Sequence, residues 1–176
     1  MSLYVYVDNS NLCTEGKRLS AVNTGLAFDM HDAITRDVTD HSWSCDLGKL
    51  VQAVGPASEI IGGSSVFGFR PHEDDSLWTL ATQQGFDILV SEPHAEDIVD
   101  VALATRVMVD SYERMQPGDT TVLVAGDRGY LPVIESLRQR GWDVRVAFWH
   151  HATARELRSG QAEFVSLDEL FDAVTT

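Results

Sequence analysis

The sequence predicts an α/β protein with three layers, α/β/α, in which helices cover both faces of a mostly parallel central sheet of about five strands. Apolar runs alternate with segments of helical periodicity along most of the chain, as expected for strands joined by crossover helices. Several of these runs are continuous in Val, Ile and Leu, which is typical of strands buried on both faces. With 176 residues, 44% of them hydrophobic, the chain is expected to form one domain over residues 1–176.

The N-terminal quarter of the chain begins this alternation. A strand is predicted at 5–7 and a short helix over 11–19. The polar stretch 20–45 has weak periodicity and is interpreted as an insertion whose structure the sequence does not assign. Apolar residues then recur with helical spacing over 47–54, and the Gly-Pro pair at 55–56 ends that helix.

The rest of the chain continues the pattern more regularly. Glycines end two of the predicted helices, and a Pro-Gly turn separates the longest helix from the strand that follows it. The predicted strands lie in 58–71, 86–93, 120–127 and 142–149. The predicted helices lie in 73–85, in a long segment that begins at Glu96, in 131–141, and in one or two closing helices within 152–174.

Composition excludes several classes of protein. The chain has 13 Lys and Arg against 27 Asp and Glu, and the net charge of −14 argues against tight non-specific binding to long duplexes. No apolar stretch reaches the roughly 18 to 20 residues of a membrane span, and the N-terminus lacks a basic region before an apolar one, so a cytoplasmic protein is expected. Cys13 and Cys45 match no disulfide framework or C-x-x-C pattern and are expected to be free thiols.

Acidic residues follow two of the predicted strands. Asp8 ends the first apolar run, and Asp127 ends the run VLVAG. In open parallel sheets the carboxyl ends of the strands border the ligand crevice. If these two strands are neighbours at the centre of the sheet, the two carboxylates meet at one rim, where they suit a divalent cation.

The long helix supplies a third acid. Asp100 lies one turn after Glu96 and Asp97, so these side chains share a helix face near its N-terminus. Clustered carboxylates repel one another, and Mg²⁺ or Mn²⁺ would remove that cost. A bound ion of this kind can activate water and polarise a phosphate oxygen, which points to phosphodiester hydrolysis.

Four segments, in order along nearly the whole chain, resemble those of the NYN domain family of PIN-like ribonucleases. They are VYVDNSNL, DVALATRVMVD, VLVAGDRGYLPVIESLRQRGWDVRVAFW and ELRSGQAEFVSLDEL. The resemblance implies a PIN-like, Rossmann-like fold and a metal-dependent nuclease that acts on RNA. It also implies that Asp8, Asn11, Asp100 and Asp127 surround the metal.

The sequence departs from the family pattern at two acidic positions. Arg106 stands where a further acid is usual on the helix, and the usual Gly-Asp-Ser-Asp-Phe segment reads GDRGY, with Gly129 in place of the second acid. Asp97 replaces a common Lys, so Glu96 and Asp97 offer negative charge from another direction.

Structural roles are alternatives for the same residues. Asp8 and Asn11 are also suited to cap the first helix, because such side chains accept backbone N–H bonds there. Asp127 is also suited to a turn. His150 and His151 are interpreted as a solvated pair in a loop rather than as part of a site.

Two hypotheses of different classes follow. The first is a Mg²⁺- or Mn²⁺-dependent endoribonuclease for single-stranded RNA, with Asp8, Asp100 and Asp127 on the metal and Asn11 orienting substrate or water. Its phosphate contacts are expected from Lys17, Arg18, Arg70 and Arg128. The second is a module that binds RNA or a protein partner without turnover, for which Arg106 and Gly129 are the motivation. A generic nucleotide-binding domain is disfavoured because no G-x-G-x-x-G or Walker segment follows the first strand. A homodimer is compatible with both hypotheses.

Overall fold

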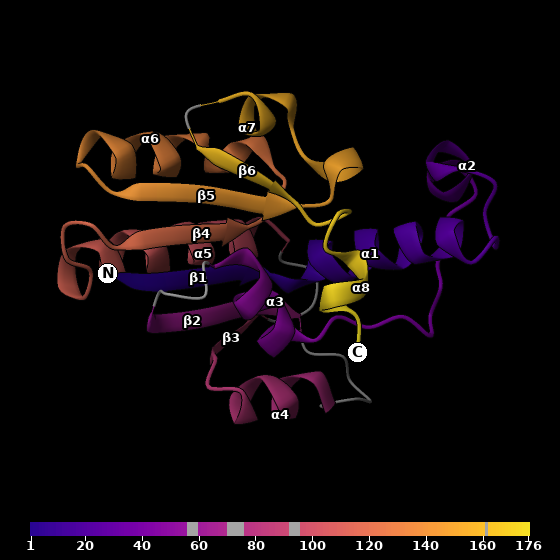
Figure 1. The fold of residues 1–176 in the computed structure, drawn as a ribbon, viewed down its shortest axis with the longest axis horizontal. Coiled ribbons are helices and arrows are strands. Elements are labelled where there is room, and N and C mark those ends of the chain that lie inside the picture. Colours follow the sequence, from indigo (N-terminus) through magenta and orange to yellow (C-terminus); the bar gives the residue numbers. More distant parts are fainter. Residues whose placement is uncertain (56–59, 70–75, 92–95, 161) are drawn as a thin grey trace.

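A computed structural model describes residues 1–55, 60–69, 76–91, 96–160 and 162–176. Within these residues, strands form one sheet in the order β3-β2-β1-β4-β5-β6, and every neighbouring pair is parallel (Figure 1). The predicted α/β fold with a parallel sheet is therefore confirmed. The strands are β1 (Ser2–Asp8), β2 (Ile60–Phe69), β3 (Asp87–Ser91), β4 (Thr120–Val124), β5 (Asp143–Phe148) and β6 (Glu163–Ser166).

Helices cover both faces of the sheet, so the structure has three layers. The helices are α1 (Asn9–Asn23), α2 (Met30–Thr35), α3 (Leu47–Val54), α4 (Ser76–Gln83), α5 (Glu96–Glu113), α6 (Leu131–Gln139), α7 (Arg155–Arg158) and α8 (Phe171–Val174), and two 3-10 turns are η1 (Arg128–Tyr130) and η2 (His150–Ala152). One hydrophobic core joins the sheet to α1, α3, α4 and α8, and the other joins it to α5, α6 and α7. None of the described helices is long and apolar enough to cross a membrane.

The first strand shows how the sequence builds the two cores. Successive side chains of a strand point to opposite faces. Leu3, Val5 and Val7 accordingly enter the core beneath α3, whereas Tyr4 and Tyr6 enter the core beneath α5. All five are buried, and a fully buried side chain of this size contributes about 1.5 to 3 kcal/mol. Because both faces of β1 are buried, every position from Leu3 to Val7 is apolar or aromatic, and the run is continuous in the sequence.

The C-terminal segment contains a strand that the sequence pattern does not predict. Helices alone were expected within 152–174, but β6 pairs with β5 there at the edge of the sheet. The strand has only four residues, and none of its side chains is fully buried, so it has no recognisable apolar run. The expected helices exist as α7 and α8, each with four residues.

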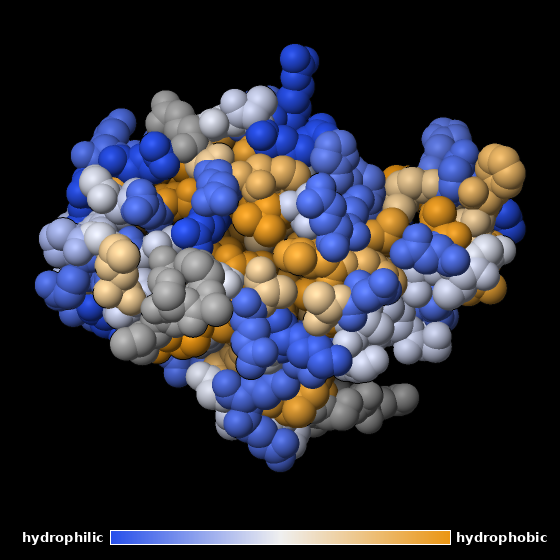
Figure 2. Space-filling view, in the orientation of Figure 1, coloured by the Kyte–Doolittle hydropathy of each residue, from blue (hydrophilic) through white to orange (hydrophobic). Residues whose placement is uncertain are grey.

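The insertion over 20–45 extends α1 and adds α2 at the far end of α1 from the sheet (Figure 1). The pair of helices encloses a small cluster of alanines, and Figure 2 shows polar and apolar residues mixed on this projection, where Phe28 is 90% exposed. The chain then returns to the main core at Trp43, whose indole packs against α1 at Gly16. A side chain at Gly16 would overlap that indole, so the glycine permits the contact.

Both cysteines are free, as their spacing predicts. Burial raises the pKa of the Cys13 thiol to about 11, and burial also raises the pKa of Cys45. Because the thiolate is the reactive form, both groups are protonated and of low reactivity at neutral pH.

The order of the strands places the first and fourth strands side by side at the centre of the sheet. From β1 the chain moves outward through β2 to β3, and from β4 it moves the other way through β5 to β6. The switch point of the topology therefore lies between β1 and β4, where ligands bind in open α/β sheets. The condition that Asp8 and Asp127 follow neighbouring strands is met.

Candidate functional site

Asp8 ends β1 and is the N-cap of α1. The backbone N–H of Asn11 donates to its Oδ1 at 3.2 Å, and the side-chain amide of Asn11 donates to its Oδ2 at 2.7 Å. The capping alternative is thus observed, and it involves the same pair of residues as the candidate site. Asp8 is only 2% exposed, and this burial raises its pKa, with a smaller contribution from the charge of Asp100.

Asp100 lies on α5, about one turn after the start of that helix. Its carboxylate is half-buried, and Oδ1 accepts a hydrogen bond of 2.6 Å from the phenol of Tyr130. Because Tyr130 lies in the turn after β4, this hydrogen bond places the N-terminal part of α5 at the same edge of the sheet as the end of β1.

Asp127 follows β4 and is the N-cap of η1, where its Oδ1 accepts from the backbone N–H of Gly129 at 2.6 Å. It is exposed, and the turn role considered for it is the observed geometry. The chain passes so close to Phe148 and the carbonyl of Ala152 that no side chain fits at Gly126. This close approach fixes the position from which Asp127 projects.

Tyr130 donates a hydrogen bond to Asp100 and is influenced by the charges of all three acids, and it was not identified from the sequence. Its phenol is buried, and its pKa is raised by that burial, by the hydrogen bond to Asp100, and by the charges of Asp8, Asp100 and Asp127. All three acids therefore lie within electrostatic reach of one hydroxyl group. The available signal was GDRGY, in which a tyrosine stands where the family segment usually has phenylalanine.

The three acids do not form a closed cluster. Among the residues that the structure describes, no group of three or more His, Cys, Asp and Glu side chains could hold a metal ion. The side chains of Glu96 and Asp97 lie outside the described part of the chain. Shared ligation by Asp8, Asp100 and Asp127 therefore stays a prediction.

The available donors nevertheless fit the chemistry of Mg²⁺ or Mn²⁺. These hard cations prefer carboxylate oxygens, and Mg²⁺ usually takes only one or two carboxylates and completes its coordination with water and substrate phosphate. Asp8 and Asp100 are two such carboxylates with mutual repulsion, and burial further disfavours the charge on Asp8. A cation beside them would relieve both costs.

A cavity of about 340 Å³ is bordered by Asp127 and by Asn11, the hydrogen-bond partner of Asp8. Its walls come from α1, from the turn after β4, and from the end of β5 and the turn that follows. The residues that line it are Asn11, Glu15, Gly126, Asp127, Arg128, Phe148, Ala152 and Ala154. Asn11 and Asp127 thus border one hollow at the switch point.

The basic side chains that are predicted to contact phosphate differ in their exposure and in the ion pairs that they already form. Arg128 is exposed at the cavity and has no ion pair with any described residue, and Lys17 is half-buried on α1. The guanidinium of Arg18 already pairs with Glu15 at 2.6 Å and with Asp37 at 3.0 Å. Arg70 lies outside the described residues.

The two adjacent histidines have different environments, and the expectation of a solvated pair is wrong for one of them. His150 is exposed, and its ring contacts Arg158. The side chain of His151 is only 14% exposed, and Nε2 lies 3.0 Å from Oε2 of Glu15. His151 therefore links η2 to α1 beside the cavity, across 136 positions of sequence.

Arg106 pairs with acids other than the three candidate residues. Its guanidinium contacts Asp87 at 2.7 Å and Asp110 at 2.9 Å, and Asp110 also accepts from the phenol of Tyr6 at 2.9 Å. Arg106 thus neutralises buried negative charge on the same helix, which explains why an arginine is accommodated at a position where the family usually has an acid.

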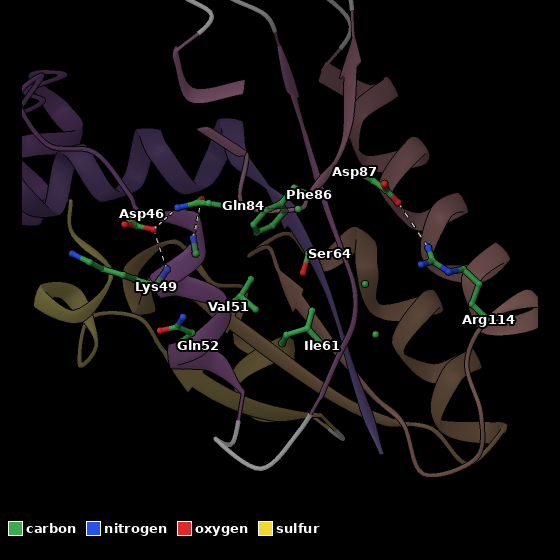
Figure 3. Close-up of a pocket in the computed structure, with 14 residues that line it drawn as sticks. Asp46, Lys49, Val51, Gln52, Ile61, Ser64, Gln84, Phe86, Asp87 and Arg114 are labelled. Atoms are coloured by element: carbon green, nitrogen blue, oxygen red, sulfur yellow. Dashed lines mark hydrogen bonds and ion pairs between the residues drawn. The ribbon is translucent and has the colours of Figure 1, made fainter. Parts of the chain in front are cut away.

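A larger cavity, of about 660 Å³, lies between α3 and the amino-terminal parts of β2 and β3 (Figure 3). The polar and charged side chains at its rim contact one another: Asp46 accepts a hydrogen bond from Gln84 at 3.0 Å, and Asp87 lies 3.8 Å from Arg114. None of the three candidate acids lines it. Because it opens at the opposite edge of the sheet, it is separate from the site at the switch point.

Comparison with known proteins identifies the family. No curated protein matches the chain. The fold is similar to that of a protein of unknown function from Vibrio parahaemolyticus, with a TM-score of 0.69 and 14% sequence identity over 99% of this chain and 96% of that chain. The NYN domain family matches residues 3–168, nearly the whole chain. The chain therefore belongs to the NYN domain family, as the resemblance of its motifs implies.

Proposed function

We propose that this protein is a metal-dependent endoribonuclease that hydrolyses phosphodiester bonds of single-stranded RNA in the cytoplasm. The supporting observation is that Asp8 and Asp127 of an NYN domain follow the neighbouring strands β1 and β4 at the switch point, where Tyr130 of the turn after Asp127 donates a hydrogen bond to Asp100. This arrangement concentrates negative charge where α/β sheets bind ligands.

Asp8, Asp100 and Asp127 would hold Mg²⁺ or Mn²⁺, which when bound would lower the pKa of water and polarise a phosphate oxygen. The other roles belong to side chains around the cavity. Asn11 fixes Asp8 through one N–H of its amide and keeps its carbonyl oxygen and second N–H for substrate or water. Arg128, at the cavity, and Lys17, on α1, would receive phosphates of the RNA.

The test is cleavage of an end-labelled single-stranded RNA by the purified protein with Mg²⁺ or Mn²⁺. EDTA should stop cleavage, and Asp8→Asn should lower the rate by orders of magnitude because a ligand charge is lost. Asp143→Asn is a matched control, because this exposed acid begins β5 at the opposite edge of the sheet. Cleavage that persists in EDTA, or in Asp8→Asn at the control rate, would overturn the proposal.

A second candidate is a catalytically impaired module that binds RNA or a protein partner. It is favoured by Gly129 at a usual acidic position and by the lack of a three-acid cluster among the described residues. In this case the same RNA should bind equally well with and without EDTA and should remain intact. Light scattering on the same sample would test for the homodimer, which both candidates allow.

A further inference from the structure

We propose that Tyr130 is a positioning residue for the metal site: its phenol holds one oxygen of Asp100, so that the other oxygen is directed to the cation. This inference rests on the proposed function and assigns a role to a side chain that the family pattern does not provide. The phenol donates to Oδ1 of Asp100 at 2.6 Å and is buried with the rest of Tyr130, which is 2% exposed.

The hydrogen bond links two elements that the site requires. Tyr130 belongs to η1, directly after Asp127, and Asp100 belongs to α5, 30 positions earlier in the sequence. A phenylalanine would fill the same space without this link. The hydroxyl therefore sets the orientation of the Asp100 carboxylate relative to the turn that carries Asp127, in the way that outer-shell partners orient metal ligands.

A second tyrosine in the same fold shows what a purely structural pairing looks like. Tyr6 is also buried and donates to Oδ2 of Asp110 at 2.9 Å. Asp110, however, also contacts Arg106 at 2.9 Å and Arg114 at 3.6 Å, so its charge is balanced. Asp100 has no Lys or Arg partner within the described ranges, and a phenol supplies no charge. The hydrogen bond from Tyr130 therefore orients Asp100 but does not balance its negative charge, so that charge is available to a cation.

The experiment measures the binding of Mn²⁺ by calorimetry to the full chain and to four variants. Tyr130→Phe should weaken the Mn²⁺ affinity about 10-fold to 100-fold, the usual effect of removing an outer-shell partner. Tyr6→Phe is the matched control: it removes the equivalent hydroxyl from the Asp110 pair and should leave the affinity unchanged. Asp100→Asn should weaken the affinity, and adding Tyr130→Phe to it should weaken the affinity no further, because the phenol acts through Asp100.

Thermal melting in EDTA supplies a readout that is independent of the metal. Both phenylalanine variants should lower the melting temperature to a similar degree, and only Tyr130→Phe should also change the Mn²⁺ affinity. If Tyr130→Phe has the same Mn²⁺ affinity as the unchanged protein while Asp100→Asn has a weaker one, the positioning role is overturned and the proposed function stands. If the unchanged protein itself binds no Mn²⁺, both are overturned. If the two substitutions at Tyr130 and Asp100 have additive effects, the hydroxyl of Tyr130 acts independently of Asp100 and the positioning role is overturned.

Discussion

The side chain of Asp8 caps α1 and is at the same time an ionisable carboxyl group in an almost fully buried position. These two properties oppose each other. The hydrogen bonds from Asn11 favour the ionised carboxylate, whereas burial disfavours it more strongly, so the net result is a raised pKa. Residues of this kind are kept at a cost in stability, which is the usual condition of groups that serve a site.

Asp8→Asn should therefore raise the melting temperature of the metal-free protein at neutral pH. The folded-state pKa of Asp8 lies above its unfolded value near 3.9, so ionisation of Asp8 weakens folding progressively as the pH rises through the folded pKa. Asparagine is an equally good N-cap and carries no charge. Melting curves in EDTA should show a gap between variant and unchanged protein that is widest above the folded pKa and closes as the pH falls below it; a variant that is less stable throughout this range contradicts the argument.

At the scale of the element, α5 serves two separate regions. Its first turns bring Asp100 to the carboxyl edge of the sheet, whereas Arg106 and Asp110 lie farther along and connect the helix to β1 and β3. The second region is an ion-pair network around the buried carboxylate of Asp110. This network accounts for an arginine at position 106 by its contribution to folding, without a role in catalysis.

Arg106→Ala should cost about 2 kcal/mol of folding free energy, because it leaves Asp110, whose side chain is 4% exposed, without its closest cation. Arg114→Ala is the matched control. Its Nη1 lies 3.6 Å from Asp110 and 3.8 Å from Asp87, and its side chain is 39% exposed, so its loss should cost no more than about 1 kcal/mol. Urea denaturation measures both. Equal costs would mean that Arg106 is not the main partner of Asp110, and a changed Mn²⁺ affinity in Arg106→Ala would connect the two regions.

The turn after β4 offers a direct test of the missing acid. Gly129 does not have the left-handed backbone that would exclude a side chain, although a Cβ there would lie 3.0 Å from Oδ1 of Asp127. Gly129→Asp should therefore fold, lower the melting temperature in EDTA through repulsion from Asp127, and tighten Mn²⁺ binding by adding a carboxylate. Gly129→Ala carries the same Cβ without the charge and separates crowding from ligation. If the two variants bind Mn²⁺ equally, an acid at this position does not contribute.

At the scale of the whole molecule, the sequence predicted those strands and helices that form because of the residues within them. The central strands β1 and β4 are continuous apolar runs closed by acids, and α3 coincides with its predicted range of 47–54. The parts that were missed depend on contacts distant in sequence. β6 is defined by its pairing with β5, Tyr130 by its hydrogen bond to Asp100, and His151 by a residue 136 positions away.

The charge of the whole molecule sets the conditions for RNA binding. At −14 the chain repels a polyanion over most of its surface, so attraction must come from a few cations near the cavity. Arg128 is the exposed cation at that hollow, with Lys17 on the adjacent helix. We therefore expect weak binding of single-stranded RNA with a shallow dependence on salt.

Arg128→Ala should reduce that dependence by one phosphate contact. For single strands, the slope of log K against log salt is about −0.7 per contact, so two contacts give about −1.4 and the variant about −0.7. Fluorescence anisotropy in EDTA, between about 50 and 200 mM salt, measures the slope while the proposed cleavage is stopped. Arg36→Ala is the matched control, because it removes the same charge from the C-terminal end of α2, where Arg36 is 63% exposed and pairs with Asp32. If both variants change the slope equally, the RNA responds to overall charge and not to a contact at the cavity; if only Arg128→Ala does, the phosphate lies beside the acids at the switch point.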